Sequence, residues 1–338
     1  MKTENLKIDI HVHLVSHSTA SGCLVSPKLR HSLSFWLIAK QLNIDTRLPA
    51  YQQDELYLTR LIQSLERSEL DRAVLLALDG VFHENGDFDE SRTHLLISNS
   101  HVASLCRRFP KQFLFGASVH PFRPNALEEL DSCANLGAVL LKLLPNSQGF
   151  DPANPRLKPY YHKLAELKLP LLIHTGHEHA LPVINQDYGR PERLRLALDE
   201  GVTVIAAHAG SIGRPHFHET FDDFLKLLPL YPNLFGDTSA LTGFFRAYCL
   251  KLLANPLTLM DQYGISSHDL FERLLHGSDY PIPPNPLAFI GELNRKDRCA
   301  IAARPSQFQQ DIEIKRRLGL PDEILTRANQ ILRLTGDE

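Results

Sequence analysis

The sequence is poor in cysteine and has no apolar run long enough to cross a membrane. Its five cysteines lie far apart and form no C-x-x-C pair, which argues against a disulfide scaffold. The longest apolar runs, such as AVLLAL at 73–78, are far shorter than the roughly 20 residues that span a bilayer. Charges recur every few positions in MKTENLKIDIHVH, so no secretory signal is visible there. We therefore expect a soluble, cytoplasmic protein with reduced thiols and no membrane partner.

The sequence also lacks an excess of charge of either sign. It carries 36 basic and 39 acidic residues, for a formal net charge of -3. This balance gives no electrostatic reason to expect nucleic-acid binding, so a small molecule is the expected partner. Assembly into a homo-oligomer stays open. The 338 residues contain no internal repeat and no low-complexity linker, so residues 1–338 are expected to form a single domain with a large core.

Eight short apolar runs recur along the chain, most of them followed by an amphipathic stretch. They are LKIDIHVH from 6, AVLLALDG from 73, FLFGASVHP from 113, AVLLKLLP from 138, PLLIHTG from 170, VTVIAAHAG from 202, NLFGDTSA from 233 and RLLHGSDYP from 273. Alternating strands and helices of this number predict an α/β fold, a (β/α)8 TIM barrel. A doubly wound sheet is disfavoured because no G-x-G-x-x-G or Walker pattern occurs.

Two segments exceed a simple barrel and distort it. Residues 14–54, inserted after the first strand, contain a helical patch around Trp36, and we expect either a lid or pocket wall or a cover for the rim of the core. Residues 300–338 are expected to form closing helices, with one amphipathic helix over 322–334. A further helical stripe runs from Leu95 through Val102 to Cys106.

The first strand carries a D-x-H-x-H pattern. Because side chains alternate along a strand, Asp9, His11 and His13 are expected to point to one face and Ile10 and Val12 to the other. Two imidazoles on one face are spaced for one metal ion. A polar strand face or hydrogen-bonded core histidines would explain the same pair.

Three more polar residues stand at the carboxyl ends of other apolar strands, namely His174, His208 and Asp279. That end of a barrel is where active sites are built. Imidazoles and a carboxylate gathered there would be costly without a partner, and a divalent cation supplies the missing charge. The sequence therefore predicts a metal site.

Lys142 lies near the end of the fourth run, AVLLKLLP. It is interpreted either as a carbamylated lysine that bridges two metals or as an ordinary amine that snorkels past the rim or is hydrogen-bonded. The number of metals, one or two, stays open.

The pattern resembles the amidohydrolase superfamily, and within it the amidohydrolase-related (amidohydrolase 2) group of hydrolases and decarboxylases. The similarity is carried by D-x-H-x-H, by His174 in LLIHTG, His208 in AAHAG and Asp279 in HGSDYP, and by the later ANQILRL segment. The resemblance implies that His11, His13 and Asp279 hold a first metal, zinc or alternatively manganese. His174 and His208 would then hold a second metal or divide between ligand and transition-state roles. Asp279 and His208 are the implied catalytic residues.

The same resemblance implies a metal-dependent hydrolase that cleaves an amide, lactone or related ester-like bond of a small substrate, one that could carry a carboxylate. Non-oxidative decarboxylation is the alternative, since it can use the same ligands without an attacking water. A third hypothesis is a catalytically silent barrel that retains metal. Candidate substrate-binding residues follow the strands on the same face: Arg123, His177, His120 and Arg214. Asp237 and Ser239, in GDTSA, could order water behind the ligands or cap a helix.

Overall fold

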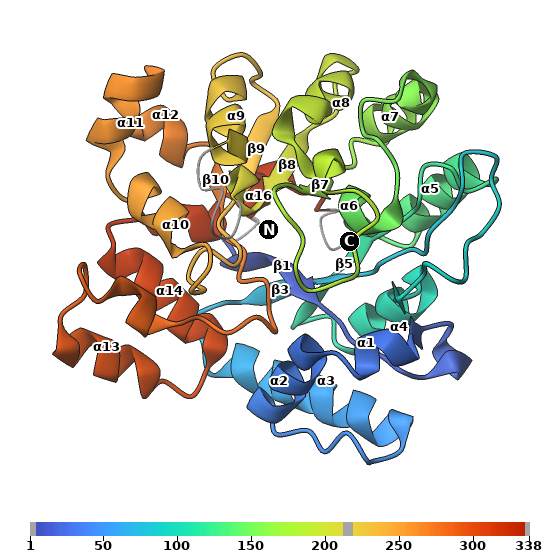
Figure 1. The fold of residues 1–338 in the computed structure, drawn as a ribbon, viewed down its shortest axis with the longest axis horizontal. Helices are drawn as coiled ribbons and strands as arrows, with labels where there is room; N and C mark the ends of the chain where they lie inside the picture. Colours follow the sequence, from blue (N-terminus) through green and yellow to red (C-terminus); the bar gives the residue numbers. More distant parts are fainter. Residues whose placement is uncertain (1–4, 212–218, 335–338) are drawn as a thin grey trace.

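The computed structural model describes residues 5–211 and 219–334, which form a barrel of parallel strands inside a ring of helices (Figure 1). The strands are β1 (Ile8–His13), β3 (Arg72–Leu76), β5 (Phe113–Ala117), β6 (Ala138–Leu143), β7 (Leu171–His174), β8 (Val204–Ala207), β9 (Leu234–Asp237) and β10 (Leu274–Leu275). Each pairs in parallel with the next. The TIM-barrel prediction is confirmed, and each predicted run contains one strand.

Backbone hydrogen bonds between β1 and the segment after β10 close the barrel. Ile10 N donates to His276 O at 3.1 Å, Asp279 N donates to His11 O at 3.0 Å, and His13 N donates to Tyr280 O at 2.9 Å. The last bonded positions carry three of the predicted metal ligands. Closure of the barrel therefore brings the D-x-H-x-H strand and the HGSDYP segment to one place.

The helices on the outside of the barrel follow the order of the strands. The longer ones are α3 (Ala50–Glu66), α4 (Asn99–Arg108), α5 (Ala126–Asn135), α7 (Lys158–Glu166), α9 (Glu219–Leu227), α10 (Ala247–Leu253), α11 (Pro256–Tyr263), α13 (Arg295–Ala302) and α14 (Gln307–Arg317). Shorter ones are α1 (Pro27–Arg30), α6 (Pro145–Gln148), α8 (Arg195–Asp199) and α12 (Ser267–Phe271). None of the helices in the described ranges is long and apolar enough to cross a membrane.

Two apolar layers separate the inside of the barrel from its outside. The inner layer includes Ile8, Ile10, Leu140, Leu172 and Ile205, while residues one position away on β6, β7 and β8 pack outward under the helices. This alternation points Lys142 and His174 into the barrel, on the same faces as the leucines two positions before them.

A β-bulge interrupts the alternation in β1, which corrects one expectation. Asp9 pairs with Ala73 but Val12 pairs with Leu75, so Ile10 and His11 together stand opposite one residue of β3. Ile10 belongs to the inner apolar layer, and His11 after the bulge also turns inward toward the site. Asp9 therefore does not share a face with His11 and His13, because it lies before the extra residue.

The carboxylate of Asp9 instead joins a buried polar cluster on the outer side of β1. Its Oδ2 lies 3.8 Å from His276 Nε2, and the charges of Lys315 and Asp311 on α14 act on it. Its Oδ1 accepts hydrogen bonds from His11 N at 2.9 Å and Ser278 N at 3.1 Å. Asp9 thus links the first and last strands behind the predicted ligands.

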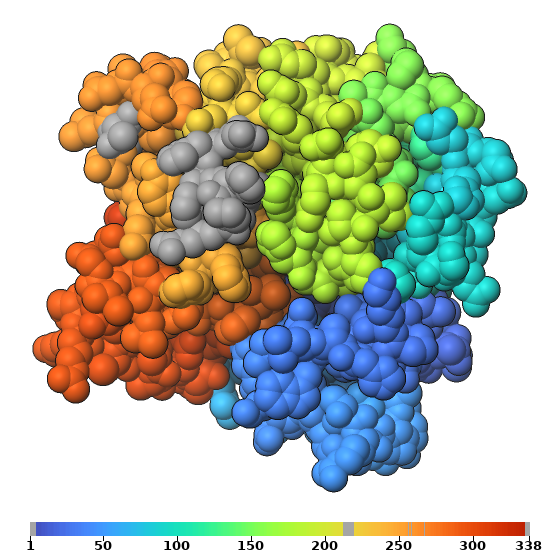
Figure 2. Space-filling model, viewed as in Figure 1, coloured from blue at the N-terminus to red at the C-terminus, as the bar shows by residue number. Residues whose placement is uncertain are grey.

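The inserted segment 14–54 lies at one edge of the barrel mouth, in blue in Figure 2, beside yellow-green atoms that include the loop after β7. It contains β2 (Leu24–Val25) and α2 (Leu33–Gln41). Leu33, Trp36 and Leu37 of α2 are 50 to 70% exposed, so this patch does not cover the core. The lid role of the segment stays a prediction.

Two expected helices have different bounds. Leu95 and Leu96 form β4, paired with β2, and α4 begins only after Ser98, whose hydroxyl accepts from His101 N. The tail folds as two short helices, α15 (Glu323–Thr326) and α16 (Ala328–Ile331), in place of one continuous helix. Ala328 and Leu332 still face inward and close the bottom of the inner layer.

Candidate metal centre

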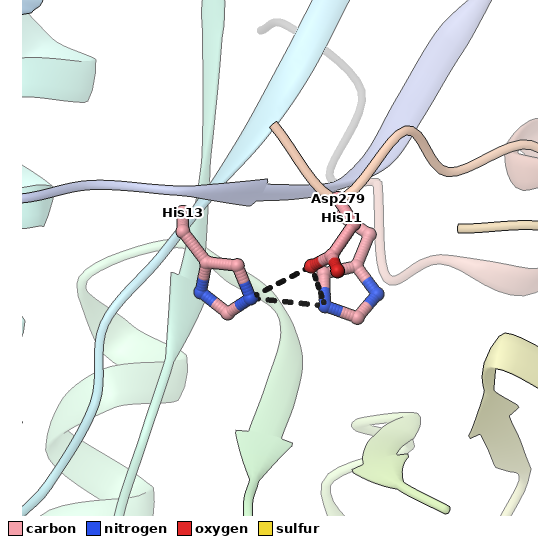
Figure 3. A group of neighbouring side chains, drawn as sticks. All are labelled: His11, His13 and Asp279. Atoms are coloured by element: carbon pink, nitrogen blue, oxygen red, sulfur yellow. Dashed lines mark hydrogen bonds and ion pairs between the residues drawn. The ribbon is translucent and has the colours of Figure 1, made fainter. Parts of the chain in front are cut away.

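Three predicted ligands converge at the carboxyl end of the barrel (Figure 3). His11 Nε2 lies 3.2 Å from His13 Nε2, and Asp279 Oδ1 lies 3.4 Å from His11 Nε2 and 3.1 Å from His13 Nε2. His11 is fully buried, whereas the side chains of His13 and Asp279 are 31% and 14% exposed. The cluster is therefore reached from the mouth of the barrel.

A second pair of histidines adjoins this cluster. His208 Nε2 lies 3.2 Å from His174 Nδ1, and the ring centroids of His208 and His11 are 5.2 Å apart. Glu178 Oε2 lies 3.5 Å from His174 Nδ1, so an acidic residue that the sequence analysis did not single out borders the pair. His174 Nε2 is buried and has no hydrogen-bond partner among the described residues.

Two of these residues have backbone conformations that residues other than glycine rarely adopt. His208 has a φ of 59° and Asp279 a φ of 65°. Left-handed conformations of this kind cost free energy and persist where the surrounding structure enforces them, often at functional sites. Here they turn both side chains inward, His208 directly after β8 and Asp279 in the segment that follows β10.

Burial keeps the inner histidines neutral. It lowers the pKa of His11 to about 4, with the nearby charge of Lys142 acting in the same direction, and it lowers the pKa values of His174 and His208 well below the usual range. Burial alone would raise the pKa of Asp279, but the hydrogen bond with His13 and the electrostatic effect of the neighbouring imidazoles of His11 and His13 bring the pKa below its ordinary value. Neutral imidazoles beside an ionised carboxylate are the protonation states that metal binding requires.

Lys142 reaches the same cluster from β6. Its Nζ lies 3.0 Å from His11 Nε2, and the side chain is buried inside the barrel without reaching past the rim. Burial lowers the pKa of Lys142 to about 8, which enlarges the fraction of neutral amine. The neutral amine is the form that can take up carbon dioxide, so the position suits the carbamate hypothesis, and the contact with His11 equally suits a hydrogen-bonded amine.

The donor set fits a divalent cation. Within the described ranges, two groups have ligand atoms within 4.8 Å of one another: His11, His13 and Asp279, and His11, His208 and Asp237. Imidazole nitrogen and carboxylate oxygen are ligands that zinc accepts, commonly three with an open fourth position in catalytic sites. The first group matches that pattern, since its atoms meet at the exposed mouth.

The substrate-binding candidates after β5 lie outside this cluster. His120 is fully buried; its Nδ1 accepts from Phe122 N at 3.1 Å, and its Nε2 donates to Gln148 O at 3.1 Å. Arg123 Nη1 lies 3.1 Å from Asp79 Oδ1. Both side chains are engaged within the protein, so their contacts do not support a role in substrate binding.

The other two candidates have different outcomes. Arg214 lies outside the described residues. His177 is half-buried after β7, and its carbonyl oxygen accepts a 2.8 Å hydrogen bond from Arg246 Nη2. The structure thus connects His177 to an arginine that the sequence analysis missed.

Arg246 is buried beside the metal cluster. Its guanidinium donates to the carbonyl and hydroxyl of Ser211 and to the carbonyl of His177, all neutral acceptors. Its charge acts on His174 and His208, while Asp279 and Glu178 act on Arg246. Arg246 lies in the segment before α10, far in sequence from every ligand motif, so no local pattern marked it.

Asp237 and Ser239 lie directly behind the ligands. Asp237 Oδ2 accepts from His11 Nδ1 at 2.7 Å, and Ser239 Oγ lies 2.8 Å from His208 Nδ1. Both side chains are fully buried. They therefore contact the far sides of two predicted ligand rings, and neither caps a following helix.

The model of the amidohydrolase family matches residues 8–301 of the chain. The matched range includes every predicted ligand, from His11 to Asp279. No curated protein matches the sequence.

Solved structures share the fold at low sequence identity. An uncharacterized TIM-barrel protein of Bordetella bronchiseptica is 18% identical with a TM-score of 0.58, over 95% of this chain and 99% of that chain. The 5-carboxyvanillate decarboxylase of Sphingomonas paucimobilis is 12% identical with a TM-score of 0.57, over 98% and 100%. A proposed 2-pyrone-4,6-dicarboxylic acid hydrolase of Pseudomonas putida is 18% identical with a TM-score of 0.55, over 97% and 95%. At these identities the likeness concerns the fold alone.

Proposed function

The chain belongs to the amidohydrolase family, and from this premise we propose that it is a metal-dependent hydrolase of an amide, lactone or related ester-like bond in a small, carboxylate-bearing substrate. One observation carries the proposal: His11 Nε2, His13 Nε2 and Asp279 Oδ1 meet within 3.4 Å of one another at the mouth of the barrel. Barrel enzymes build their active sites on this face.

We propose that a zinc ion, or alternatively manganese, is held by His11, His13 and Asp279, with His174 and His208 as further ligands of the same or a second ion. The chemistry that a divalent cation would supply there is activation of water, by lowering its pKa to about 7, and polarisation of a carbonyl. Asp279, ionised and open to the mouth, accepts a proton from water at its carboxylate and returns it to the leaving group. His208 faces Ser239 with Nδ1, which leaves Nε2 for the site.

Arg246 supports the carboxylate-bearing substrate. Its side chain is buried, and the groups it contacts among the described residues are neutral acceptors. A buried guanidinium gains most from an anionic partner, and its planar fork suits a carboxylate. We propose that Arg246 binds the substrate carboxylate.

Non-oxidative decarboxylation is the second candidate. The same ligands and Arg246 would bind an aromatic or unsaturated acid, and one fold relative, with a TM-score of 0.57, is a decarboxylase. The two reactions differ in their products, because hydrolysis places an oxygen of water in the product and decarboxylation releases carbon dioxide.

The first test is the metal content of protein purified without chelator. We expect at least one equivalent of zinc or manganese, reduced by Asp279→Asn and by His208→Asn. His31→Asn, which alters an exposed histidine away from the cluster, should bind as the wild type does. No bound metal, even after supplementation, would overturn the proposal. Two equivalents that fall to one in Lys142→Ala would establish a carbamate-bridged pair.

The second test separates the reactions. Metal-loaded enzyme is screened against lactones, amides and aromatic acids in water enriched in heavy oxygen. Heavy oxygen in an acid product supports hydrolysis, and released carbon dioxide without heavy oxygen in the product supports decarboxylation. An enzyme that binds metal and turns over none of these classes would favour the silent barrel.

A further inference from the structure

One buried carboxylate touches two histidines that come from different strands. Asp237, at the end of β9, is fully buried. Its Oδ2 lies 2.7 Å from His11 Nδ1, and its Oδ1 accepts from His208 N at 2.7 Å and from Ser239 N at 3.0 Å. The hydroxyl of Ser239 also contacts Oδ1. Asp237 thus has contacts with both β1 and the end of β8.

The contact with His11 fixes where that ring carries its proton. An ionised carboxylate only accepts hydrogen bonds, so the nitrogen that faces Asp237 must be Nδ1–H. A neutral imidazole has one protonated nitrogen, and Nε2 of His11 is then a lone pair. That Nε2 is the atom that lies 3.2 Å from His13 Nε2 and 3.4 Å from Asp279 Oδ1.

Ser239 extends the same constraint to His208. Because Asp237 Oδ1 can only accept, the Ser239 hydroxyl donates its hydrogen bond to Asp237. The Ser239 oxygen is then an acceptor for His208 Nδ1, 2.8 Å away, and Ser239 O is a second acceptor at 3.1 Å. Nδ1 of His208 is therefore protonated, and its Nε2, which faces His174, carries the lone pair.

We propose that Asp237 is a positioning residue that sets the tautomers of two metal-binding histidines, His11 directly and His208 through Ser239. Both Nε2 lone pairs are thereby directed into the site before any metal binds. The inference rests on the proposed metal function. Asp237 is not itself a ligand in this account, since both of its oxygens are occupied by donors.

Asp237→Asn gives a specific expectation. Three donors surround Oδ1, so the amide oxygen of asparagine will take that place and its NH2 will face His11 Nδ1. A donor at this position requires Nδ1 of His11 to accept, which moves the ring proton to Nε2. The lone pair is then turned away from the metal.

The direct test reads ring protons in the metal-free protein. Long-range proton–nitrogen NMR on protein labelled with nitrogen-15 histidine distinguishes the two tautomers. We expect Nδ1–H at His11 and His208 in the wild type, and Nε2–H at His11 in Asp237→Asn. Ser239→Ala should leave His11 unchanged and place His208 in a mixture, because Ser239 O remains as an acceptor. Unchanged tautomers in Asp237→Asn, or Nε2–H at His11 in the wild type, would overturn the inference.

Metal affinity, measured by competition with a chromophoric chelator and zinc alone, is the second readout. Loss of such supporting contacts typically costs 10–100-fold in affinity, so we expect about that loss in Asp237→Asn and less in Ser239→Ala. Thr238→Val is the matched control, because Thr238 is equally buried and bonds only toward Leu275 O among the described residues. Equal losses in all three variants would mean a merely structural role.

The two variants keep the test independent of folding and of the proposed function. If Asp237→Asn fails to fold, the His208 tautomer in Ser239→Ala tests the proposal instead. A pure Nδ1–H state of His208 in that variant would mean that Asp237 does not act on His208 through Ser239. If wild-type protein shows the expected tautomers but binds no metal, the proposed function fails while the tautomer assignment stands.

Discussion

Gly277 shows how little space surrounds the ligand rings at the scale of single residues. A Cβ at this position would lie 2.9 Å from His11 Cβ, 3.1 Å from Ser239 Cβ and 3.4 Å from Asp237 Oδ2. The missing side chain therefore lets strand β1 and the end of β9 approach each other behind the proposed metal site.

We predict that Gly277→Ala displaces His11. Overpacking of this kind costs about 1–3 kcal/mol, and the shifted ring should weaken zinc binding. Gly291→Ala is the control, because a Cβ there meets nothing within 4 Å. Urea unfolding of the metal-free proteins and zinc competition measure the two effects. Wild-type zinc affinity in Gly277→Ala would contradict the prediction.

His120 has a pH-dependent role in stability. Burial lowers the pKa of His120 to about 4, so the folded protein keeps this ring neutral, while in the unfolded chain it is protonated below its ordinary pKa of 6.5. A lowered histidine pKa contributes stability that is present above pH 6.5 and is lost as the pH falls toward 4. The shift corresponds to roughly 3 kcal/mol.

The difference in the free energy of unfolding between wild type and His120→Asn should therefore become smaller as the pH falls. The gap in the free energy of unfolding, measured with urea on metal-free protein, is expected to shrink by about that amount between pH 7 and pH 4. A gap that does not change with pH would contradict the assignment. A large change in substrate affinity, with little change in stability, would return His120 to the substrate site.

At the scale of elements, α14 carries a buried ion pair whose two side chains also form hydrogen bonds to other parts of the barrel. Lys315 Nζ lies 2.5 Å from Asp311 Oδ2 and donates to Gly277 O at 2.8 Å, while Thr242 Oγ1 donates to Asp311 Oδ1 at 2.6 Å. These hydrogen bonds tie α14 to the segment between β10 and Asp279 and to the segment that contains Thr242.

Lys315→Met should destabilise the protein by about 3–5 kcal/mol, because it leaves Asp311 charged and buried without its partner. The double variant Lys315→Met with Asp311→Leu should recover most of that loss. Lys251→Met breaks a partly exposed pair with Glu292, 3.0 Å away, and should cost less than about 1 kcal/mol. Unfolding in urea measures all three. Equal losses in the single and double variants would show that the pairing is not what matters.

At the scale of the whole molecule, the proposed ligands join the first strand to the last. His11 and His13 lie on β1, and Asp279 follows β10, where the barrel closes. A metal bound there adds a link across the closure. Zinc at about a hundred times its Kd should stabilise the fold by about 3 kcal/mol.

Removal of the metal by a chelator should therefore lower the Tm and weaken the hydrogen-bonded pairing between β1 and the segment after β10. Hydrogen exchange is expected to rise most in residues 8–13 and 274–280, with little change in β5, which carries none of the proposed ligands. A uniform rise in hydrogen exchange over the whole barrel would contradict a specific effect on the pairing between β1 and the segment after β10.

Much of this architecture is predictable because local patterns encode it. The eight apolar runs and the residues that end them, such as His174 and His208, follow from alternation along single strands. Arg246 and Glu178 were not predictable, since their position beside the site depends on how distant loops pack. The roles of Asp237 and Ser239 were open for the same reason. The carboxylate of Asp237 on β9 meets the His11 ring on β1 only after the barrel closes.

The bulge in β1 reverses which residues of this strand face the interior of the barrel. Up to Ile10, even-numbered residues face the interior, whereas after the extra residue His11 and His13 do so and Val12 packs outward. The letters D-x-H-x-H are therefore not portable by themselves. Grafted into a regular strand, the same six residues IDIHVH would turn Asp9 inward with the histidines and bury its carboxylate where this barrel keeps Ile8 and Ile10. A designer who transfers this proposed metal site must also transfer the register shift between Asp9 and Val12.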